Sequence, residues 1–324
     1  MKKFMLIVVS LLVVVLSGCG SQGSSNREAA ADYPEREITL VVPFAAGGAS
    51  DSTARIVAAE LEKTLDVPVI IDNRTGGTGT VGLNYVRNAE PDGYTIGYVP
   101  AELAMYEPLG LSDIAPDSFD LIAQATLVPA AVTVPADAPY NTVAEFVEHA
   151  KNNEGQVKVG NSGAGSIWHV AATAFAHETG VTFNDIPFDG AAPAVTALMG
   201  GHIDAVMVSI GEVKSGIESG KLKALAVMSA ERHPNFPDVP TLKEEGVDLE
   251  YAGWGGFVVP KGTPDEIKAV LMEAFEKAIN SEAFEQFASG QGMVVAFRPS
   301  EEFGQFAQEQ YEFFSELIPT MELN

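Results

Sequence analysis

Two glycine-rich loops in the sequence carry the residue types that bind a small anion. The first lies at residues 44–51 (FAAGGASD), between an apolar run and a helical pattern that begins near Asp51. Such a loop brings free backbone N–H groups and the positive end of the helix dipole to one point. Since the same layout also occurs as plain scaffold, this loop alone does not decide between binding and structure.

The same arrangement recurs at residues 157–180 (VKVGNSGAGSIWHVAATAFAHETG). A strand pattern leads into a Gly/Ser loop, and the following helix is expected to begin with Ser166 as N-cap and to end at Gly180. Ligands of open α/β sheets bind at the carboxyl ends of the strands. Two such loops that face each other would form a cleft with two helix N-termini pointing into it.

Ser162, Ser166 and His169 raise the alternative of a serine hydrolase. Ser166 and His169 share one helix face, and the residues around Ser162 approach the nucleophile-elbow pattern but lack its final glycine. A catalytic pair would also need an oriented base and an oxyanion hole. We therefore expect Ser166 as a helix cap and His169 at the edge of the cleft, with an esterase-like hydrolase as the alternative function.

The remaining motifs point to structure. Residues 77–82 (GTGTVG) match a dinucleotide fingerprint, but they follow the second expected strand and indicate a tight turn. The five histidines show no metal-ligating spacing, so we predict neither a metal nor a cofactor. Trp254 lies among glycines before an apolar strand, where core packing is favoured over a place in the cleft wall.

Short apolar runs alternate with amphipathic patterns along most of the chain. Strands are expected at residues 38–44, 67–71, 94–99, 121–134, 157–161, 182–187, 205–209, 222–228, 255–259 and 293–297. Helices are expected after Asp51, Gly82, Thr142, Ser166, Ala192, Thr263, Ser281 and Ser300. This alternation, with nearly continuous apolar strands, predicts an α/β fold with parallel-rich sheets flanked by helices.

The composition limits both the fold and the partners. The 324 residues are 46% hydrophobic, which is enough for a packed core, and their number suggests two domains. The formal net charge of −25 argues against nucleic acid as a partner. Cys19 is the one cysteine, so the folded part is expected to hold neither a disulfide nor a thiolate metal site.

The first residues indicate export. Two lysines precede an apolar run at residues 4–16, which is shorter than a membrane span of about 20 residues. The sequence LSGC that ends at Cys19 resembles the lipobox of bacterial lipoproteins. We therefore expect a signal peptide at residues 1–18, lipidation of Cys19 and a flexible tether at residues 19–34. The protein would then be extracytoplasmic and lipid-anchored to the cell membrane.

Six motifs in order along the chain resemble those of the Bug receptors, the TctC-type solute-binding proteins of tripartite tricarboxylate transporters. They are YPEREITLVVPFAAGGASDSTAR, VIIDNRTGGTGTVGLNYVRNAEPDGYT, GNSGAGSIWHVA, PFDGAAPAVTALMGGHIDAV, LKALAVMSAERHPNFPDVPTLKEEGV and WGGFVVPKGTPDEI. The resemblance implies a two-domain periplasmic-binding-protein fold with a ligand cleft between the domains. Domain 1 would comprise residues 35–125 plus 229–324, and domain 2 residues 126–228.

The resemblance also implies a function. The protein would be a monomer that delivers a small organic carboxylate to the membrane permease subunits of a tripartite transporter, or alternatively a ligand-sensing receptor for a signalling partner. In the family, the loops matched here by residues 45–51 and 161–166 grip the ligand carboxylate, and residues 188–193 match a third cleft loop. The predicted ligand-binding residues are Phe44, Ala46, Gly47, Gly48, Ser50, Asp51, Asn161, Ser162, Ala164, Gly165, Ser166, His169, Asp189 and Glu102.

Individual residues in these loops have expected roles. Gly47 and Gly48 would let the backbone approach a carboxylate closely, and Ser50 would donate a hydrogen bond. Asp51 cannot donate when ionised, so it would serve as the N-cap and as an acceptor for an ordered water.

Four positions depart from the family pattern. Ala45 replaces a usual proline, Thr173 a common glutamate, Asp189 a basic or neutral residue, and Glu102 an uncharged polar residue. Two acids near the site would oppose a ligand with several negative charges. This favours a monocarboxylate, or a ligand whose remainder is neutral or carries an amine, over citrate. The alternative is that both acids only reflect the acidic surface.

Overall fold

The computed structural model describes residues 33–188 and 190–320. Cys19, most of the tether and Asp189 lie outside these residues, so the predictions made for them stay predictions. The strands are β1 Ile38–Val42, β2 Val69–Asn73, β3 Thr95–Pro100, β4 Phe119–Pro135, β5 Lys158–Asn161, β6 Asn184–Pro187, β7 Ala205–Ser209, β8 Leu222–Val227, β9 Ala252–Pro260 and β10 Val294–Pro299. The helices are α2 Ala49–Leu65, α3 Thr80–Arg87, α4 Val143–Asn152, α5 Ile167–Thr179, α6 Ala191–Met199, α7 Ile210–Glu218, α8 Asp265–Ile279, α9 Glu282–Gly290 and α10 Ser300–Leu317. Short 3-10 turns lie at η1 Gly77–Gly79, η2 Ala101–Ala104, η3 Pro116–Ser118 and η4 Ile318–Thr320.

These strands form one connected sheet in the order β2-β1-β3-β9-β4-β7-β5-β6, with β8 and β10 paired to β4 beside this path. β1 pairs in parallel with β2 and β3, and β5 pairs in parallel with β6 and β7. β9 and β4 join the two parallel groups through antiparallel pairs. The predicted α/β architecture is confirmed, and the parallel pairing lies in the outer strands of each group.

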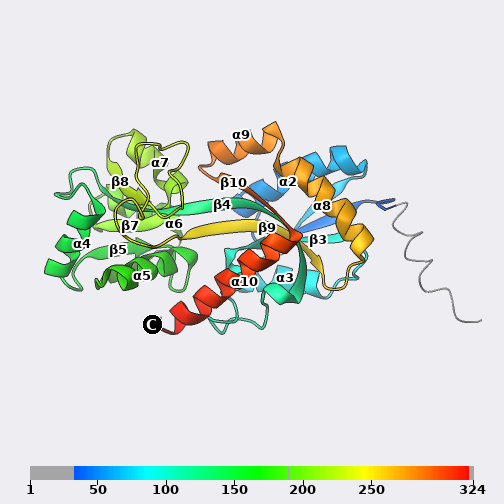
Figure 1. Ribbon diagram of the computed structural model, residues 1–324, viewed down its shortest axis with the longest axis horizontal. Helices are drawn as coiled ribbons and strands as arrows, with labels where there is room; N and C mark the ends of the chain where they lie inside the picture. The colour runs from blue at the N-terminus through cyan, green and yellow to red at the C-terminus, as the bar shows by residue number, and fades with distance from the viewer. Residues whose placement is uncertain (1–32, 189, 321–324) are drawn as a thin grey trace, which may run out of the picture.

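β4 serves both groups of strands. Its 17 residues pair with β9 and β10 in their first part and with β7 and β8 in their last part. Figure 1 shows two lobes with β4 and β9 running between them. In the middle of β4 the burial is interrupted at Leu127 and Val128, at the passage from one lobe to the other. The predicted domain limits stay a prediction.

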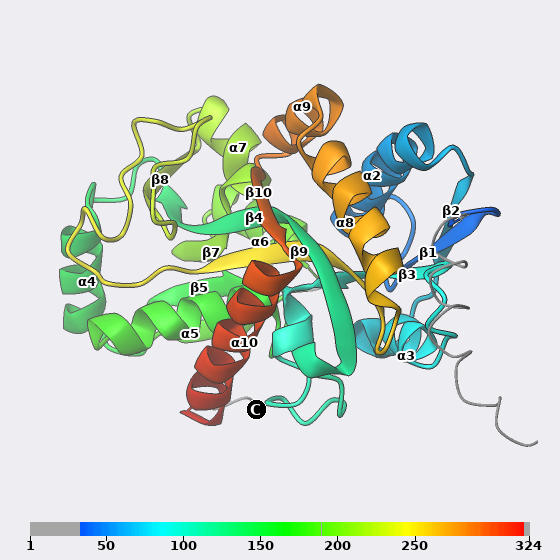
Figure 2. The ribbon, with the colours of Figure 1, turned by 45° about the vertical axis from the view of Figure 1, so that its right-hand side comes forward.

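Helices cover both faces of the first lobe, which contains β1, β2 and β3. α2 and α8 pack on one face through Val57, Leu61, Leu271 and Phe275, which have no exposed surface. α3 and α10 lie on the opposite side of the sheet (Figure 2). The second lobe, with β5, β6 and β7, is flanked by α4 to α7. The loops that follow β1 and β5 are thus anchored at both ends in packed strands and helices.

The sequence does not predict α7. Its start carries a capping box, in which Ser209 Oγ accepts the N–H of Glu212 and the Glu212 carboxylate accepts the N–H of Ser209. The serine and glutamate at this spacing are the signal that could have found it. The expected helices are all present, but α3 begins at Thr80 and so includes Gly82, and of the predicted tight turn at residues 77–82 only residues 77–79 form a turn. Trp254 is buried and packs edge-on against Phe303 and Phe306 of α10, as a core residue.

Candidate functional site

The side chain of Asp51 forms hydrogen bonds that hold the loop after β1 in place. Its Oδ2 accepts the backbone N–H of Gly47 and Nε of Arg55, both at 2.8 Å, and its Oδ1 accepts Nδ2 of Asn73 at 2.9 Å. Asn73 also donates to the carbonyl oxygen of Phe44. Asp51 is 2% exposed, and the Arg55 guanidinium lowers the pKa of Asp51 to about 2. The carboxylate is therefore ionised, and both of its oxygens already accept hydrogen bonds from the protein.

This geometry corrects the N-cap role expected for Asp51. The N-cap of α2 is Gly48, with φ −79° and ψ 175°, and no described side chain caps this helix. Asp51 lies in the first turn instead, because Arg55 and Asn73 hold its carboxylate on the inner side of the loop. The first N–H groups of α2 have no partner within the helix and lie at the positive end of its dipole.

His169 holds the loop after β5 in the same way. Its Nδ1 accepts the backbone N–H of Gly165 at 3.0 Å, and Ser166 Oγ accepts the N–H of His169 at 3.2 Å. Oδ1 of Asn161 accepts the N–H of Gly163 at 3.0 Å. Ser166 is therefore the N-cap of α5, as predicted, and α5 ends at Gly180. The loop is braced by its own side chains.

The two loops share one construction. In each, a glycine with positive φ, Gly47 at 88° or Gly165 at 72°, donates its N–H to the side chain four residues later. Glycine adopts this backbone without the strain of a Cβ. The acceptors differ in charge, because burial lowers the pKa of His169 and the Asp185 carboxylate, 4.0 Å from Nε2, opposes this only in part. One brace is an anion and the other a neutral ring.

Glu102 lies in the turn after β3, and because β3 pairs in parallel with β1, this turn and the first loop lie at the same edge of the sheet. Burial, with a smaller contribution from the Glu102 charge, raises the pKa of Tyr98 to about 12 and that of Tyr251 well above its usual range. The side chains of Ser50 and Thr126 oppose this rise in the pKa of Tyr98 in part. The Tyr251 hydroxyl donates to the carbonyl oxygen of Ile167, at the start of α5, at 2.9 Å.

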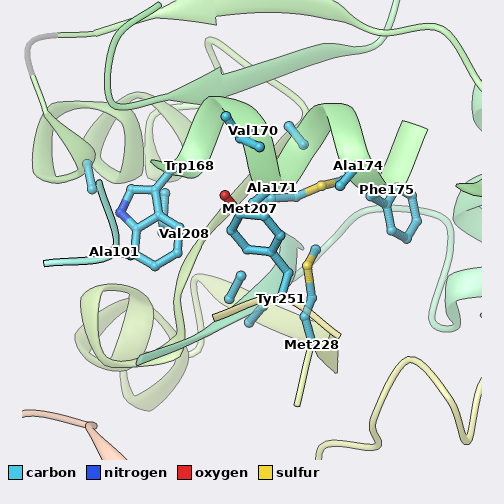
Figure 3. Packing of buried hydrophobic residues seen from close by; sticks show 14 of the residues in the cluster. Ala101, Trp168, Val170, Ala171, Ala174, Phe175, Met207, Val208, Met228 and Tyr251 are labelled. Atoms are coloured by element: carbon cyan, nitrogen blue, oxygen red, sulfur yellow. The ribbon is translucent and has the colours of Figure 1, made fainter. Parts of the chain in front are cut away.

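Packed side chains join the two lobes at this place. Figure 3 shows Ala101, from the turn after β3, beside Trp168 of α5, with Tyr251 close to the same helix. All three are buried. A Cβ added to Gly165 would lie 3.6 Å from Cδ2 of Leu109. The segment that carries Glu102 in the first lobe therefore meets the beginning of α5 in the second.

The structure places the predicted residues at different depths. Ala46, Gly47, Gly48 and Ala164 are exposed, Phe44, Ser50, Ser162, Gly165, Ser166 and Glu102 are half-buried, and Asp51, Asn161 and His169 are buried. The exposed and half-buried residues can contact a ligand, whereas the buried ones shape the loops. The third predicted loop packs on the second, because the N–H of Phe188 donates to the carbonyl oxygen of Asn161 at 3.1 Å.

The geometry of His169 is not that of a catalytic base for Ser166. Its Nδ1 faces the N–H of Gly165 and its Nε2 faces Asp185, while Ser166 Oγ serves as the helix cap.

Residues 33–188 and 190–320 contain no group of three or more His, Cys, Asp or Glu placed to hold a metal ion. In the same ranges, no helix has both the length and the apolar character needed to cross a membrane.

Sequence reasoning missed the residues that brace the site. Arg55 could have been found from its helical spacing to Asp51, and Asn73 from its place at the end of the strand beside β1. Tyr98 and Tyr251 gave no local signal, because their neighbours come from distant parts of the chain.

Comparisons of sequence and of structure with known proteins agree on one family of solute-binding receptors. Residues 53–323 match the family described as "Tripartite tricarboxylate transporter family receptor". A solved structure of a TctC solute-binding protein from Polaromonas is 42% identical, with a TM-score of 0.83 over 89% of this chain and 100% of the other. MatC from Rhodopseudomonas palustris, solved with bound malate, is 29% identical, with a TM-score of 0.71 over 88% and 100%. Protein BugT of Bordetella pertussis is 30% identical over 92% of this chain and 94% of its own length.

Proposed function

Because this chain belongs to the tripartite tricarboxylate transporter receptor family, we propose that it captures a small organic carboxylate between its lobes and delivers it to a membrane permease. The observation that carries this proposal is the pair of braced glycine loops at the carboxyl ends of β1 and β5. Malate bound to the similar MatC protein supports a small carboxylate as the ligand class.

Backbone donors would do most of the recognition. The start of α2 has no described side-chain cap, so its N–H groups and the Ser50 hydroxyl can donate to a carboxylate. Arg55, the cation nearest to this loop in sequence, is already paired with Asp51 at 2.8 Å. The acidic protein would therefore bind an anion through the dipoles of its N–H groups and of the Ser50 hydroxyl, without a free cationic side chain in this loop.

Capture would involve movement of the two lobes about the strands that join them. We keep residues 35–125 plus 229–324 and residues 126–228 as the two proposed domains. A ligand that contacts both loops binds the closed arrangement more tightly than the open one and shifts the population toward it. β4 and β9 pass between the lobes and would bend or twist in this motion.

Export and anchoring complete the proposal. The signal at residues 1–18 would be removed, Cys19 would carry lipid, and the tether would leave the receptor free beside its permease as a monomer. A ligand-sensing role would replace the permease by a signalling partner. Uptake of a labelled carboxylate by cells that carry the chain and its permease, lost when the chain is deleted, would distinguish transport from sensing.

Gly48 offers a direct test of the site. Its extended backbone suits any residue, and an added Cβ would meet only the Ala45 carbonyl oxygen at 3.6 Å. Gly48→Leu should therefore keep the fold and fill the space in front of the α2 N-terminus. We expect wild-type full chain to be stabilised by about 2.7 kcal/mol at a hundredfold ligand excess over the Kd, and Gly48→Leu to lose this shift.

Gly304→Leu is the matched control, because Gly304 lies within α10 and an added Cβ meets no atom within 4 Å. A thermal-shift screen with mono-, di- and tricarboxylates, aromatic acids and amino acids would measure all three proteins. Undiminished binding by Gly48→Leu would refute the site, and a wild type that responds to no carboxylate would refute the function.

A further inference from the structure

Glu102 is held in place by a buried turn. Of residues 101–106, it is the one that is not fully buried. The N–H groups of Met105 and Tyr106 donate to its carbonyl oxygen at 2.9 and 3.0 Å. Ala101, Leu103 and Ala104 on either side are packed in the core. The carboxylate is therefore displayed by rigid backbone and does not sit on a loose loop tip.

This carboxylate has no counter-charge among the described residues. Burial raises the pKa of Glu102, and its own backbone N–H is the one group that opposes this. The neighbouring phenols are engaged elsewhere, since Tyr106 donates to the Thr78 carbonyl oxygen at 2.8 Å and Tyr251 to that of Ile167 at 2.9 Å. No described arginine, lysine or histidine forms an ion pair with Glu102.

The surroundings of the site thus have two poles. At one pole, the uncapped start of α2 offers hydrogen-bond donors to an anion. At the other pole, half-buried Glu102 offers a carboxylate that forms no ion pair with a described cation. The two poles lie at one edge of the sheet, because β1 and β3 pair in parallel and end in the first loop and in the turn that carries Glu102, respectively. A ligand that carries both signs of charge matches this arrangement, whereas a second carboxylate would meet like charge.

We propose that Glu102 is a specificity residue that accepts hydrogen bonds from a protonated amine on the ligand, so that the receptor selects small amino-bearing monocarboxylates against di- and tricarboxylates. This inference rests on the proposed function and deepens it. It assigns the carboxylate of the ligand to the glycine loops and the amine to Glu102.

Matched ligand sets test the inference. Each set shares one carbon skeleton and contains the plain monocarboxylate, its α-amino and ω-amino derivatives and the dicarboxylate, for example butanoate, 2-aminobutanoate, 4-aminobutanoate and succinate. Sets from three to eight carbons, together with benzoate, the aminobenzoates and the benzenedicarboxylates, would be titrated calorimetrically into purified full-length protein. We expect one amino derivative to bind at least about tenfold more tightly than its plain and dicarboxylate partners.

Three variants locate the effect. Glu102→Gln should reduce the amine preference by about tenfold or more and strengthen dicarboxylate binding, whereas Glu102→Asp, which keeps the charge, should retain the preference. Glu107→Gln removes the same charge from an exposed side chain that accepts from Tyr311 and should leave the ratios unchanged. Thermal unfolding of each unliganded variant verifies its fold.

The outcomes separate the two proposals. Carboxylate binding by the wild type with an unchanged ratio in Glu102→Gln, or with a preference for dicarboxylates, would overturn the role of Glu102 and leave the receptor function intact. An absence of binding to every acid in every set would overturn the function itself, and this inference with it.

Discussion

The backbone N–H of Gly165 donates to Nδ1 of His169 across 3.0 Å, and this bond requires that Nδ1 carry no proton. Protonation of the ring would place two N–H groups opposite each other and release the loop in front of α5. On the first loop, Asp51 accepts the corresponding bond from Gly47 with a carboxylate whose pKa is about 2. The second loop is therefore the acid-sensitive one.

We expect the contributions of His169 and His233 to the free energy of unfolding to fall as the pH drops below about 6.5. Burial lowers the pKa of His169 and of His233 in the folded protein. A histidine with a lowered folded pKa contributes stability that is present above its unfolded pKa of about 6.5 and is lost as the pH falls from that value toward the folded pKa. Urea titrations at a series of pH values measure this loss.

His169→Asn should flatten this pH dependence, because its amide oxygen can accept the Gly165 N–H without titrating. His177→Asn, which changes an exposed histidine near the end of the same helix, is the control and should keep the wild-type slope. Equal slopes for the two variants would refute the role given to His169.

Asp51→Asn should destabilise the protein by about 1–3 kcal/mol. The change removes the charge from bonds to Gly47 and Arg55 at a carboxylate that is 2% exposed. The folded pKa of about 2 lies below the ordinary 3.8. The contribution of Asp51 is therefore fully present above pH 3.8 and is lost as the pH falls from there toward 2. Chemical denaturation at pH 7 measures the difference.

Asp72→Asn supplies the comparison, because Asp72 forms a partly exposed pair with Arg74, and such pairs contribute at most about 1 kcal/mol. A similar loss in both variants would show that the brace behind the first loop has no special stabilising role.

Gly47→Ala should cost about 1–2 kcal/mol, and Gly48→Ala should be within about 0.5 kcal/mol of wild type. Gly47 has φ of 88° with open space around an added Cβ, so its penalty is purely conformational. Gly48 is extended and can carry a side chain. Thermal unfolding of the pair measures the difference, and the reverse order would contradict the loop geometry.

Gly211→Ala should destabilise the contact between α7 and the segment before β10 by about 1–3 kcal/mol. An added Cβ would overlap the Gln291 carbonyl oxygen and lie 3.2 Å from Cα of Gly292. The same segment accepts from buried His233, whose Nε2 lies 3.2 Å from the Gly292 carbonyl oxygen. Gly290→Ala, where an added Cβ meets no atom within 4 Å, should be neutral in the same denaturation experiment. Equal stability would refute the close approach.

Much of the fold could be predicted because the buried strands are almost continuous apolar runs. β7 matches its predicted limits at Ala205 and Ser209, and Ser166 caps α5 as expected. α7 escaped prediction because its short, glycine-containing pattern is weak, although its capping box was visible. The start of α2 also differed from the expectation, because Arg55, one turn along the same helix, and Asn73, at the end of β2, bind the Asp51 carboxylate.

The candidate site could be predicted only where it is local. The glycine loops follow directly from strand, loop and helix patterns in one stretch of sequence. The bond from Asn73 to Asp51 depends on the pairing of β1 with β2, and the bond from Tyr251 to Ile167 depends on the return of the chain through β9. Such pairings are set by the whole sheet and leave no local pattern.

The position of β9 has a consequence for the order of folding. β9 lies between β3 and β4, where Phe257 pairs with Tyr98 on one side and with Ala123 on the other. Until residues 252–260 have left the ribosome or the export channel, β3 and the first part of β4 lack this partner and present open edges. The lobe that begins the chain is therefore completed last, and its long loop closures favour slow assembly.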